Sequence, residues 1–459
     1  MYTVYIFRRD LRLNDNLGLY YSIKNFDNII PIFIFTPEQI TDKNKFKSNN
    51  AIQFMIETLQ ELDTNLNKYN SKIHFFYGEN IKIINKIINK IKVSNIVFNK
   101  DYTPYAIKRD NEIIKLCKKN NINCYLVEDY LLKPIGTFNK KDDTAYTIFT
   151  PFKNNGMKFD IDKPLKYTIK NCVKVSSLND ISLKNKEVPK LLKSYSDTIL
   201  LKGGRSNGLK YLNKIKEQKD YNDDRNTLSL NTTLLSAYIK FGCISIREVY
   251  WKIVDTLGKK NDLLGQLFWR EFYYYICYYF PQVLKGKNYN EKYDKIKWKY
   301  NKNHFDKWKN GQTGYPVVDA GMIELKTTGY MHNRARLITS NFLNRMLGMD
   351  WRKGELYYAT QLTDYDPAVN NGNWQWIAST GTDPKPYFQR LFNPWLQSKR
   401  YDSEAEYIKK WIPQLINIPA KELHEWDKYC DNYDVKKLGY CKPVVEYKKA
   451  REESIKMYK

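Results

Sequence analysis

The 459-residue chain has few cysteines, and their spacing follows no known cysteine motif. The seven cysteines are odd in number and widely spaced, and no Cys-x-x-Cys pair occurs. This pattern argues against a disulfide framework or a zinc site and favours a reducing compartment. The cysteines are Cys117, Cys124, Cys172, Cys243, Cys277, Cys430 and Cys441. We therefore expect an intracellular protein, cytoplasmic or nuclear, that holds no metal.

Long apolar segments are also missing. The longest aromatic and apolar run, residues 272–280, is far too short to cross a bilayer. The chain opens on a strand-like run followed by charges, which is not the pattern of a secretory signal. No internal repeat and no low-complexity array is found. We therefore expect a monomeric protein without a membrane partner.

Aromatic residues and positive charge are abundant. Aromatics make up 15% of the residues, which indicates a folded chain with a sizeable core, in two or three domains. Lys and Arg number 76 against 50 Asp and Glu, so the net charge is +26. This excess favours a polyanionic partner such as nucleic acid. A Lys- and Asn-rich composition inherited from an AT-rich genome would give the same balance, so charge alone leaves both interpretations open.

The first 130 residues alternate short apolar runs with helical patterns. Strands are predicted at residues 4–7, 29–35, 73–77, 96–98 and 124–127, with helices at 50–66 and 81–91. Such alternation predicts a Rossmann-like α/β domain over residues 1–130, with a parallel sheet covered by helices on both faces. No G-x-G-x-x-G follows the first strand, so a dinucleotide bound there in the usual way is not expected.

The rest of the chain divides into two parts. Residues 153–220 are rich in Lys, Asn, Ser and Asp with weak periodicity, and we assign 131–220 as a long connecting segment. From about residue 225 the strand signals fade and helical spacing dominates. A larger, all-helical domain is therefore expected over residues 221–459.

Residues 364–376 place two carboxylates, two adjacent amides and two tryptophans in one short segment. An unpaired buried polar group costs roughly 1–3 kcal/mol, so buried carboxylates and amides need partners. The partners could come from the protein, in a capped helix end beside a Trp-lined core. They could also come from a large polar-aromatic cofactor, and the segment alone does not decide between the two.

Further motifs occur along the chain in a fixed order. They are Phe7–Asn16 (FRRDLRLNDN), Tyr146–Phe152 (YTIFTPF), Trp269–Phe272 (WREF), Thr313–Ala320 (TGYPVVDA) and Thr327–Leu337 (TTGYMHNRARL). Together with residues 364–376 they resemble the DNA photolyase/cryptochrome flavoproteins over about residues 2–450. The resemblance implies that the helical domain binds FAD in its reduced, anionic form. It also implies a UV-damaged DNA partner and a possible second, antenna chromophore of unknown identity on the α/β domain.

The resemblance assigns a cofactor-binding set. It comprises Tyr221, Thr232, Thr233, Leu234, Leu235, Ser236, Gln266, Arg270, Asn333, Arg336, Asp364, Asp366 and Asn370. The run 232–236 resembles the phosphate-binding segment, although alone it is an ordinary helix cap. By resemblance Asp364 pairs with Arg336 beside the flavin ring, and Asp366 meets the flavin edge or the ribose. Asn370 matches the residue that faces flavin N5, where a neutral amide favours the reduced anionic flavin.

Three tryptophans match the residues that carry electrons from the surface to the flavin in this family: Trp374, Trp351 and Trp298. Trp298 precedes Trp308 by ten residues, and Trp351 precedes Trp374 by twenty-three, as in photolyases. Any one of these tryptophans, taken singly, would more often fill a core.

Trp269 and Trp376 match the aromatic walls of the lesion pocket. A pyrimidine dimer must be flipped out of the duplex at a cost of a few kcal/mol, which stacking on aromatic walls offsets by roughly 1–3 kcal/mol per base. Asn333 would hydrogen-bond the base edges. Further positions match DNA contacts of relatives, although for any single cation a solvated face is the simpler interpretation. They are Arg334, Arg225, Arg390, Gln397 and Lys399.

Two pocket positions depart from bacterial-type cyclobutane-dimer photolyases. Gln266 replaces a glutamate and Leu337 replaces a methionine, although Gln266 can still donate to a thymine carbonyl. The runs 265–272 and 240–243 look more like (6-4) photolyases and animal cryptochromes. The two histidines of (6-4) repair are replaced by Asn333 and Leu337. We therefore expect a carbon–carbon lyase that splits cyclobutane pyrimidine dimers and is closest to the class I type. A cryptochrome-type light sensor is the first alternative, and (6-4) repair is the last.

Overall fold

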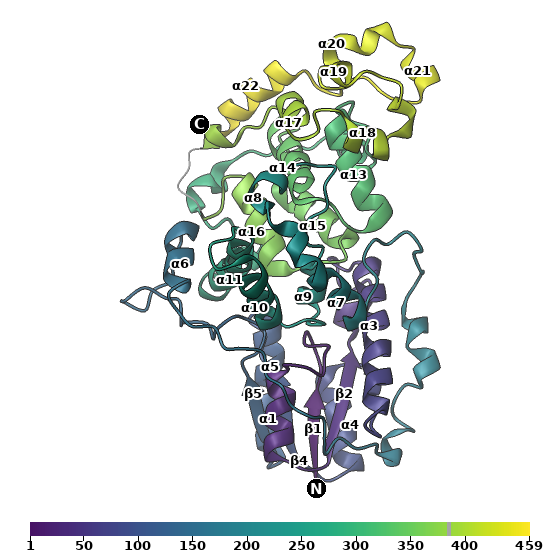
Figure 1. Cartoon of the computed structure of the whole chain (residues 1–459), viewed down its shortest axis with the longest axis vertical. Coiled ribbons are helices and arrows are strands. Elements are labelled where there is room, and N and C mark those ends of the chain that lie inside the picture. The colour runs from purple at the N-terminus through teal and green to yellow at the C-terminus, as the bar shows by residue number, and fades with distance from the viewer. Residues whose placement is uncertain (383–386) are drawn as a thin grey trace.

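A computed structural model describes residues 1–382 and 387–459. It has two parts stacked along the long axis of the molecule (Figure 1). The lower part holds the strands and the N-terminus, and the upper part is helical and carries the C-terminus.

A five-stranded parallel sheet in the order β3-β2-β1-β4-β5 forms the centre of the lower part. The strands are β1 (Tyr2–Ile6), β2 (Ile29–Phe35), β3 (His74–Tyr77), β4 (Val93–Asn99) and β5 (Asn123–Val127). All five predicted strands are confirmed. Every residue of β2 is buried, because helices cover both faces of a parallel sheet. The Rossmann-like α/β class is therefore confirmed.

Helices with recognisable start signals flank the sheet. They are α1 (Leu17–Asn25), α2 (Pro37–Ile40), α3 (Asn49–Asn67), α4 (Asn80–Lys90) and α5 (Pro104–Lys119). Ser48 accepts the N–H of Ala51 at the start of α3, and Thr103 accepts that of Ala106 at the start of α5. The two predicted helices, α3 and α4, are each confirmed to within one residue at either end.

A long stretch with little regular structure follows β5. Its elements are α6 (Phe149–Gly156), the short turns η1 (Ser176–Leu178), η2 (Asn185–Glu187) and η3 (Pro189–Leu191), α7 (Arg205–Asn213) and η4 (Lys214–Gln218). Part of this stretch runs beside α3 (Figure 1). It is tied to the sheet by backbone hydrogen bonds, from Ile29 to Asn171 at 2.7 Å and from Leu183 to Phe75 at 2.7 Å.

Every named element from Tyr221 onward is helical, as predicted. The first are α8 (Tyr221–Asp224), α9 (Ser236–Lys240), α10 (Ile246–Leu257), α11 (Leu263–Tyr279), η5 (Pro281–Lys285), η6 (Glu291–Lys295), α12 (Lys302–Lys309), α13 (Pro316–Thr328), α14 (Asn333–Asn341), η7 (Phe342–Met346), α15 (Trp351–Gln361) and α16 (Pro367–Ile377). The remainder are η8 (Tyr387–Arg390), α17 (Pro394–Tyr401), α18 (Glu406–Trp411), η9 (Pro413–Leu415), α19 (Ala420–Leu423), α20 (Trp426–Tyr429), η10 (Cys430–Asn432), α21 (Val435–Leu438) and α22 (Tyr447–Tyr458).

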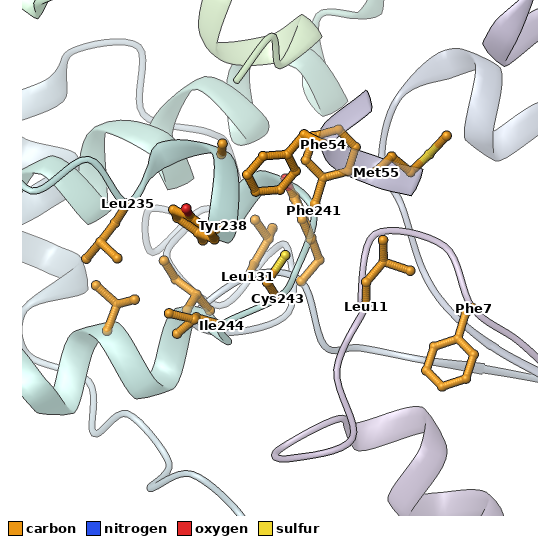
Figure 2. Close-up of a cluster of buried hydrophobic side chains, with 14 of the residues drawn as sticks. Phe7, Leu11, Phe54, Met55, Leu131, Leu235, Tyr238, Phe241, Cys243 and Ile244 are labelled. Atoms are coloured by element: carbon orange, nitrogen blue, oxygen red, sulfur yellow. The ribbon is translucent and has the colours of Figure 1, made fainter. Parts of the chain in front are cut away.

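One hydrophobic cluster spans the two parts of the molecule (Figure 2). Phe7 and Leu11 come from the segment after β1, Phe54 comes from α3, and Tyr238 and Phe241 come from α9 and its C-cap. The ring of Phe54 lies 5.1 Å from each of the latter two rings. The α/β and helical parts therefore share a core and are not joined by a flexible linker alone.

A buried ionic network lies beside this shared core. Asp129 pairs with Arg12 at 2.6 Å and with Arg247 of α10 at 2.7 Å, and Arg247 also pairs with Asp15 at 2.9 Å. Burial alone would raise the pKa of Asp129, but the two guanidinium groups outweigh it and hold that pKa below its ordinary value. Removing one member of such a network leaves its partners charged and unpaired in the interior.

We expect Asp129→Asn to destabilise the protein by about 3–5 kcal/mol, because Arg12 then lacks its buried carboxylate partner and Arg247 keeps only Asp15. The shift of the urea unfolding midpoint measures this effect. The matched control is Glu79→Gln, which breaks an exposed pair with Lys82 and should change the midpoint little. Equal shifts in the two variants would show that the network contributes no more than a surface pair.

Candidate functional site

Asp366 begins helix α16. Its Oδ1 accepts the backbone N–H groups of Ala368 and Val369 at 3.1 and 3.2 Å, and a proline occupies the first helical position. The helix then carries Asn370 and Trp374 on successive turns. The sequence folds this way because an Asp-Pro pair is a strong helix-start signal.

The second oxygen of Asp366 faces the junction with the α/β part. It accepts the hydroxyl of Tyr274 at 2.6 Å and that of Tyr130 at 3.2 Å, and it pairs with the Arg9 guanidinium. Arg9 also pairs with Asp101 at 3.3 Å. Burial would raise the pKa of Asp366, but Arg9 and Tyr274 hold it below its usual value. Both oxygens of Asp366 are thus engaged by the protein itself.

Asp364 connects three segments. Its Oδ2 accepts the Nη2–H of Arg336 at 2.9 Å and the hydroxyl of Ser236 at 2.6 Å. Arg336 is fixed in turn by donation from Nε to the Met331 carbonyl at 2.8 Å. The Oδ1 of Asp364 is buried and has no partner among the described residues. A buried carboxylate oxygen in that state is suited to a donor from a bound molecule.

The run 232–236 lies where α9 begins. Leu234 has a φ of +54°, which is unusual for a residue other than glycine and turns the backbone sharply. The Thr232 hydroxyl lies 3.4 Å from that of Tyr330, and Ser236 is exposed despite its bond to Asp364. Hydroxyls and backbone N–H groups gathered at such a turn suit a phosphate group.

Asn370 lies half-buried one turn before Trp374. Its amide nitrogen donates to the Glu355 carbonyl at 3.2 Å, which leaves the amide oxygen available as an acceptor. Trp374 is 2% exposed and packs onto the α15 backbone at Gly354. A Cβ at Gly354 would lie 2.1 Å from the indole, so this close approach requires glycine.

The other two predicted electron carriers differ in their burial and in their partners. Trp351 is fully buried and donates its Nε1–H to Asn288 at 3.0 Å. Trp298 is half-buried, with its ring edge-on to Tyr458 at 6.0 Å. Trp374 and Trp351 belong to the same hydrophobic cluster, against which Trp298 packs.

The two predicted lesion-pocket walls are half-buried tryptophans on different helices. Trp269 of α11 stacks on Phe149 with ring centroids 3.6 Å apart and planes 8° apart. Trp376 of α16 has the Arg390 guanidinium 4.3 Å from its ring centre, and Arg390 also donates to its carbonyl at 2.7 Å. Each indole is therefore held by a partner that fixes its orientation.

The remaining predicted contact residues are distributed over three helices and their ends. Asn333 is exposed at the start of α14, and Leu337 lies one turn further on. Arg334 donates to Asn226 and lies 4.3 Å above the Tyr401 ring. The others are Arg225 and Gln397, which are half-buried, and Lys399, which is exposed.

Three residues of the predicted cofactor set lie on α8 and α11. Tyr221 is buried and has Arg225 5.9 Å from its ring. Gln266 is half-buried one turn before Trp269. Arg270 faces the junction between the two parts, where it pairs with Glu271 at 2.9 Å.

The sequence analysis did not identify some of the residues that position the site. Arg9, Tyr130 and Tyr274 hold the start of α16, and Phe149 holds Trp269. Arg9 and Phe149 do lie within the motifs that carry the family resemblance. Tyr130 and Tyr274 carry no signal of their own, because a single tyrosine beside apolar or aromatic residues is indistinguishable from a core residue.

His332 is held neutral in the interior. Its Nδ1 accepts the backbone N–H of Arg334 at 3.1 Å, where it caps α14. Burial, with Arg334 and Arg336 nearby, lowers the pKa of His332 to about 4. This histidine is therefore not a proton donor near neutral pH.

Two family models match the chain. The model of DNA photolyase matches residues 3–167, and that of the FAD-binding domain of DNA photolyase matches residues 263–459. The fold and site thus define an FAD-binding flavoprotein of two parts. Within residues 1–382 and 387–459, no helix has the length and apolarity of a membrane crossing, and no His, Cys, Asp and Glu cluster is arranged to hold a metal.

Individual relatives agree over the whole length. The chain is 35% identical to a deoxyribodipyrimidine photo-lyase of Buchnera aphidicola, over 99% of this chain and 97% of the relative. It is 32% identical to the one of Escherichia coli, over 98% and 97%. A crystal structure of an archaeal photolyase from Sulfolobus tokodaii with two FAD molecules superposes with a TM-score of 0.88 at 39% identity, over 100% and 99%. The chain belongs to the DNA photolyase family.

Glu355, beside Asn370, makes the stability of the fold depend on pH. It is buried on α15, accepts from Asn371 at 2.9 Å, and burial raises its pKa from 4.5 to about 7. The folded chain therefore holds this proton more tightly than the unfolded chain. The stabilisation is complete below about pH 4.5 and is lost as the pH rises to about 7, with a size on the order of 3 kcal/mol.

We expect Glu355→Gln to flatten the pH dependence of the unfolding midpoint between about pH 4.5 and pH 7, because the amide cannot ionise. Thermal or urea unfolding across that range measures the difference from the wild type. Glu38→Gln, at an exposed carboxylate, is the control and should follow the wild-type curve. Parallel curves for Glu355→Gln and the wild type would contradict the raised pKa.

Proposed function

We propose that this protein uses blue light to split cyclobutane pyrimidine dimers in DNA, with reduced FAD as the electron source. The observation that carries the proposal is the unpartnered, buried Oδ1 of Asp364. It lies in a cluster with Arg336 and Ser236, within a domain whose family model is the FAD-binding domain of DNA photolyase. The chain's similarity to deoxyribodipyrimidine photo-lyases of other organisms supports the same reaction.

The donor and acceptor set of the helical part suits FAD. The run 232–236 would hold the pyrophosphate through hydroxyls and backbone N–H groups. Asp364 with Arg336 would meet the polar edge of the flavin ring, and the free amide oxygen of Asn370 would accept the N5–H of the reduced, anionic flavin. Asp366 would act through the junction that it stabilises, since both of its oxygens have protein partners.

When bound, reduced FAD supplies a photoexcited electron to the dimer and recovers it once the two cyclobutane bonds have opened. The protein contributes geometry and electrostatics. Trp269 and Trp376 would flank the extruded dimer, and Phe149 keeps the Trp269 plane fixed for stacking. Gln266, one turn before Trp269, would donate to a thymine carbonyl, and Asn333 would meet the base edges. Trp298, Trp351 and Trp374 would carry electrons that restore the reduced flavin.

The DNA backbone would lie along the cations around the two pocket walls. Arg225, Arg334, Gln397 and Lys399 would make phosphate contacts, and the net charge of +26 favours such a partner. Arg390 is 2% exposed and would act by holding Trp376. We also propose that the protein is monomeric and intracellular. The seven free cysteines support the intracellular location.

A second chromophore on the α/β part belongs to the proposal, although its identity stays open. A cavity of about 550 Å³ lies between α5 and the end of α11. Ile107, Lys108, Tyr278 and Lys285 contribute to its lining, so it offers apolar surface with cations at hand for an anionic pigment.

The second candidate function is light sensing without repair, as in cryptochromes. Gln266 and Leu337 favour it, because both replace residues that contact the dimer in bacterial-type enzymes. Repair of (6-4) lesions is disfavoured further by the structure. Asn333 and Leu337 occupy the positions of its histidines, and the neighbouring His332 is neutral and engaged as a helix cap.

We expect the purified, FAD-loaded protein to restore thymines from a cyclobutane-dimer oligonucleotide under blue light and to leave a (6-4) oligonucleotide unchanged. Chromatographic separation of the products measures both reactions, with a dark incubation as the control. Flavin photoreduction without loss of either lesion would assign the protein to the sensor class. A protein that stays colourless after incubation with FAD would overturn the proposal itself.

Trp376→Ala should weaken binding to dimer-containing DNA by roughly 1–3 kcal/mol, or about 5- to 150-fold, because one stacking wall is lost. Fluorescence anisotropy measures the Kd, and flavin absorbance measures FAD content, which should be unchanged. Trp251→Ala, at a half-buried tryptophan of α10 that donates to the Ile161 carbonyl, removes an indole of equal size outside the pocket walls and the proposed phosphate contacts. If it weakens DNA binding equally, Trp376 has no specific role there.

A further inference from the structure

Two aromatic rings other than those of the predicted electron carriers contact Trp374. The ring of Tyr358 lies 4.8 Å from that of Trp374, centre to centre, with the planes 72° apart. The ring of Trp308 lies 6.5 Å from it. Trp308 and Tyr358 also stack on one another at 6.0 Å with planes 6° apart. Trp374 is therefore one corner of a closed triangle of oxidisable rings.

This triangle extends toward the surface. Trp308 is fully buried, but its ring lies 5.5 Å from that of Tyr357. Tyr357 is half-buried on α15, and its hydroxyl donates to the Lys309 carbonyl at 3.1 Å. The rings of Trp374, Tyr358, Trp308 and Tyr357, which we call the aromatic relay, form a continuous series of contacts from the core to the edge of solvent.

The predicted carriers have no such ring continuity. In the part of the chain that the structure describes, no ring contact joins Trp351 to Trp374 or to Trp298. Trp351 instead carries a guanidinium, that of Arg352, 4.7 Å from its ring centre. Asp350 pairs with this guanidinium at 3.0 Å, so the effect of the cation on positive charge at the indole is partly offset. An electron that refills oxidised Trp374 can thus travel along a different and better connected path.

Hydrogen bonds set which rings of the relay can hold an oxidised state. The Thr339 hydroxyl donates to the Ala335 carbonyl at 2.7 Å and shares a hydrogen bond with the phenol of Tyr358. No ionised base takes part, so an oxidised Tyr358 could not readily release its proton. The Nε1–H of Trp308 donates to the Thr339 carbonyl at 3.0 Å, a dipole that stabilises positive charge on the indole. Tyr358 is therefore a bridge, and Trp308 is the site where the charge rests.

We propose that Trp308 is a further electron donor to Trp374, in a second branch that runs beside Trp351 and Trp298. The inference rests on the proposed function, because it concerns how bound FAD is reduced. One electron passes from Trp374 to photoexcited, oxidised FAD, and one from Trp308 refills Trp374. Tyr357 then refills Trp308 and releases its phenolic proton to water. An added thiol supplies the electron that restores Tyr357.

The test starts from Trp351→Phe, which interrupts the predicted chain and leaves the relay intact. FAD-loaded protein in the oxidised state is illuminated with blue light in the presence of a thiol, and loss of flavin absorbance gives the photoreduction rate. We expect Trp351→Phe to retain photoreduction. If the wild type photoreduces and Trp351→Phe does not, the relay does not conduct and the inference is overturned.

The double variant Trp351→Phe/Trp308→Phe should lose a further factor of about tenfold, and its loss should exceed the product of the two single losses, as parallel paths require. The matched control is Trp351→Phe/Trp395→Phe, which removes a buried indole from the same hydrophobic cluster but outside the relay. It should behave as Trp351→Phe alone. Equal rates in the two double variants would contradict the inference.

Three measurements separate a failure of the relay from other failures. FAD content and the unfolding midpoint of each variant show whether the fold and the cofactor are retained. Transient absorption of the wild type shows whether an indole radical forms at all. A wild type that binds FAD but forms no such radical would count against the proposed function, and the relay would fall with it.

Discussion

The carboxylate of Asp366 is the contact on which the geometry of the helical part depends. One oxygen starts α16, and the other is shared by Arg9, Tyr130 and Tyr274. Because Asn370, Trp374 and Trp376 all project from α16, their positions are set by a charge pair that reaches into the α/β part. A buried carboxylate so placed is tolerated because each lone pair has a donor.

The aromatic residues of the site are likewise fixed by contacts within the protein. Trp269, Trp374 and Trp376 are each held by a specific neighbour, respectively Phe149, Gly354 and Arg390. Stacking and electron transfer both depend steeply on ring position, so rigid neighbours matter as much as the rings themselves. Some tyrosines of the helical part link indole rings, so their role goes beyond filling space in the core.

Much of the architecture follows from local sequence patterns. Short apolar runs ending in turns gave the five strands, and helical apolar spacing gave α3 and α4, because these signals act within a few residues. The pairing of Asp364 with Arg336 was implied by family resemblance alone and is present at 2.9 Å.

The long-range contacts could not be read in this way. Arg9 and Asp366 are 357 positions apart, and no local pattern indicates that they meet. Asp366 was expected to meet the flavin edge or the ribose, whereas protein donors engage both of its oxygens. Likewise, Tyr358 reads as a core residue until the structure shows it between Trp308 and Trp374. Such pairings depend on tertiary packing, which overrides what neighbouring residues suggest.

The hydrophobic cluster of Figure 2 limits how much of the chain could be removed. Phe54 packs against Tyr238 and Phe241, and Phe7 and Leu11 belong to the same cluster, so cutting the chain after the sheet would expose apolar surface on both fragments. Neither fragment would be a ready-made module for transplantation. A minimal version of this protein must therefore keep the sheet as a scaffold, even where light capture by a second pigment is dispensable.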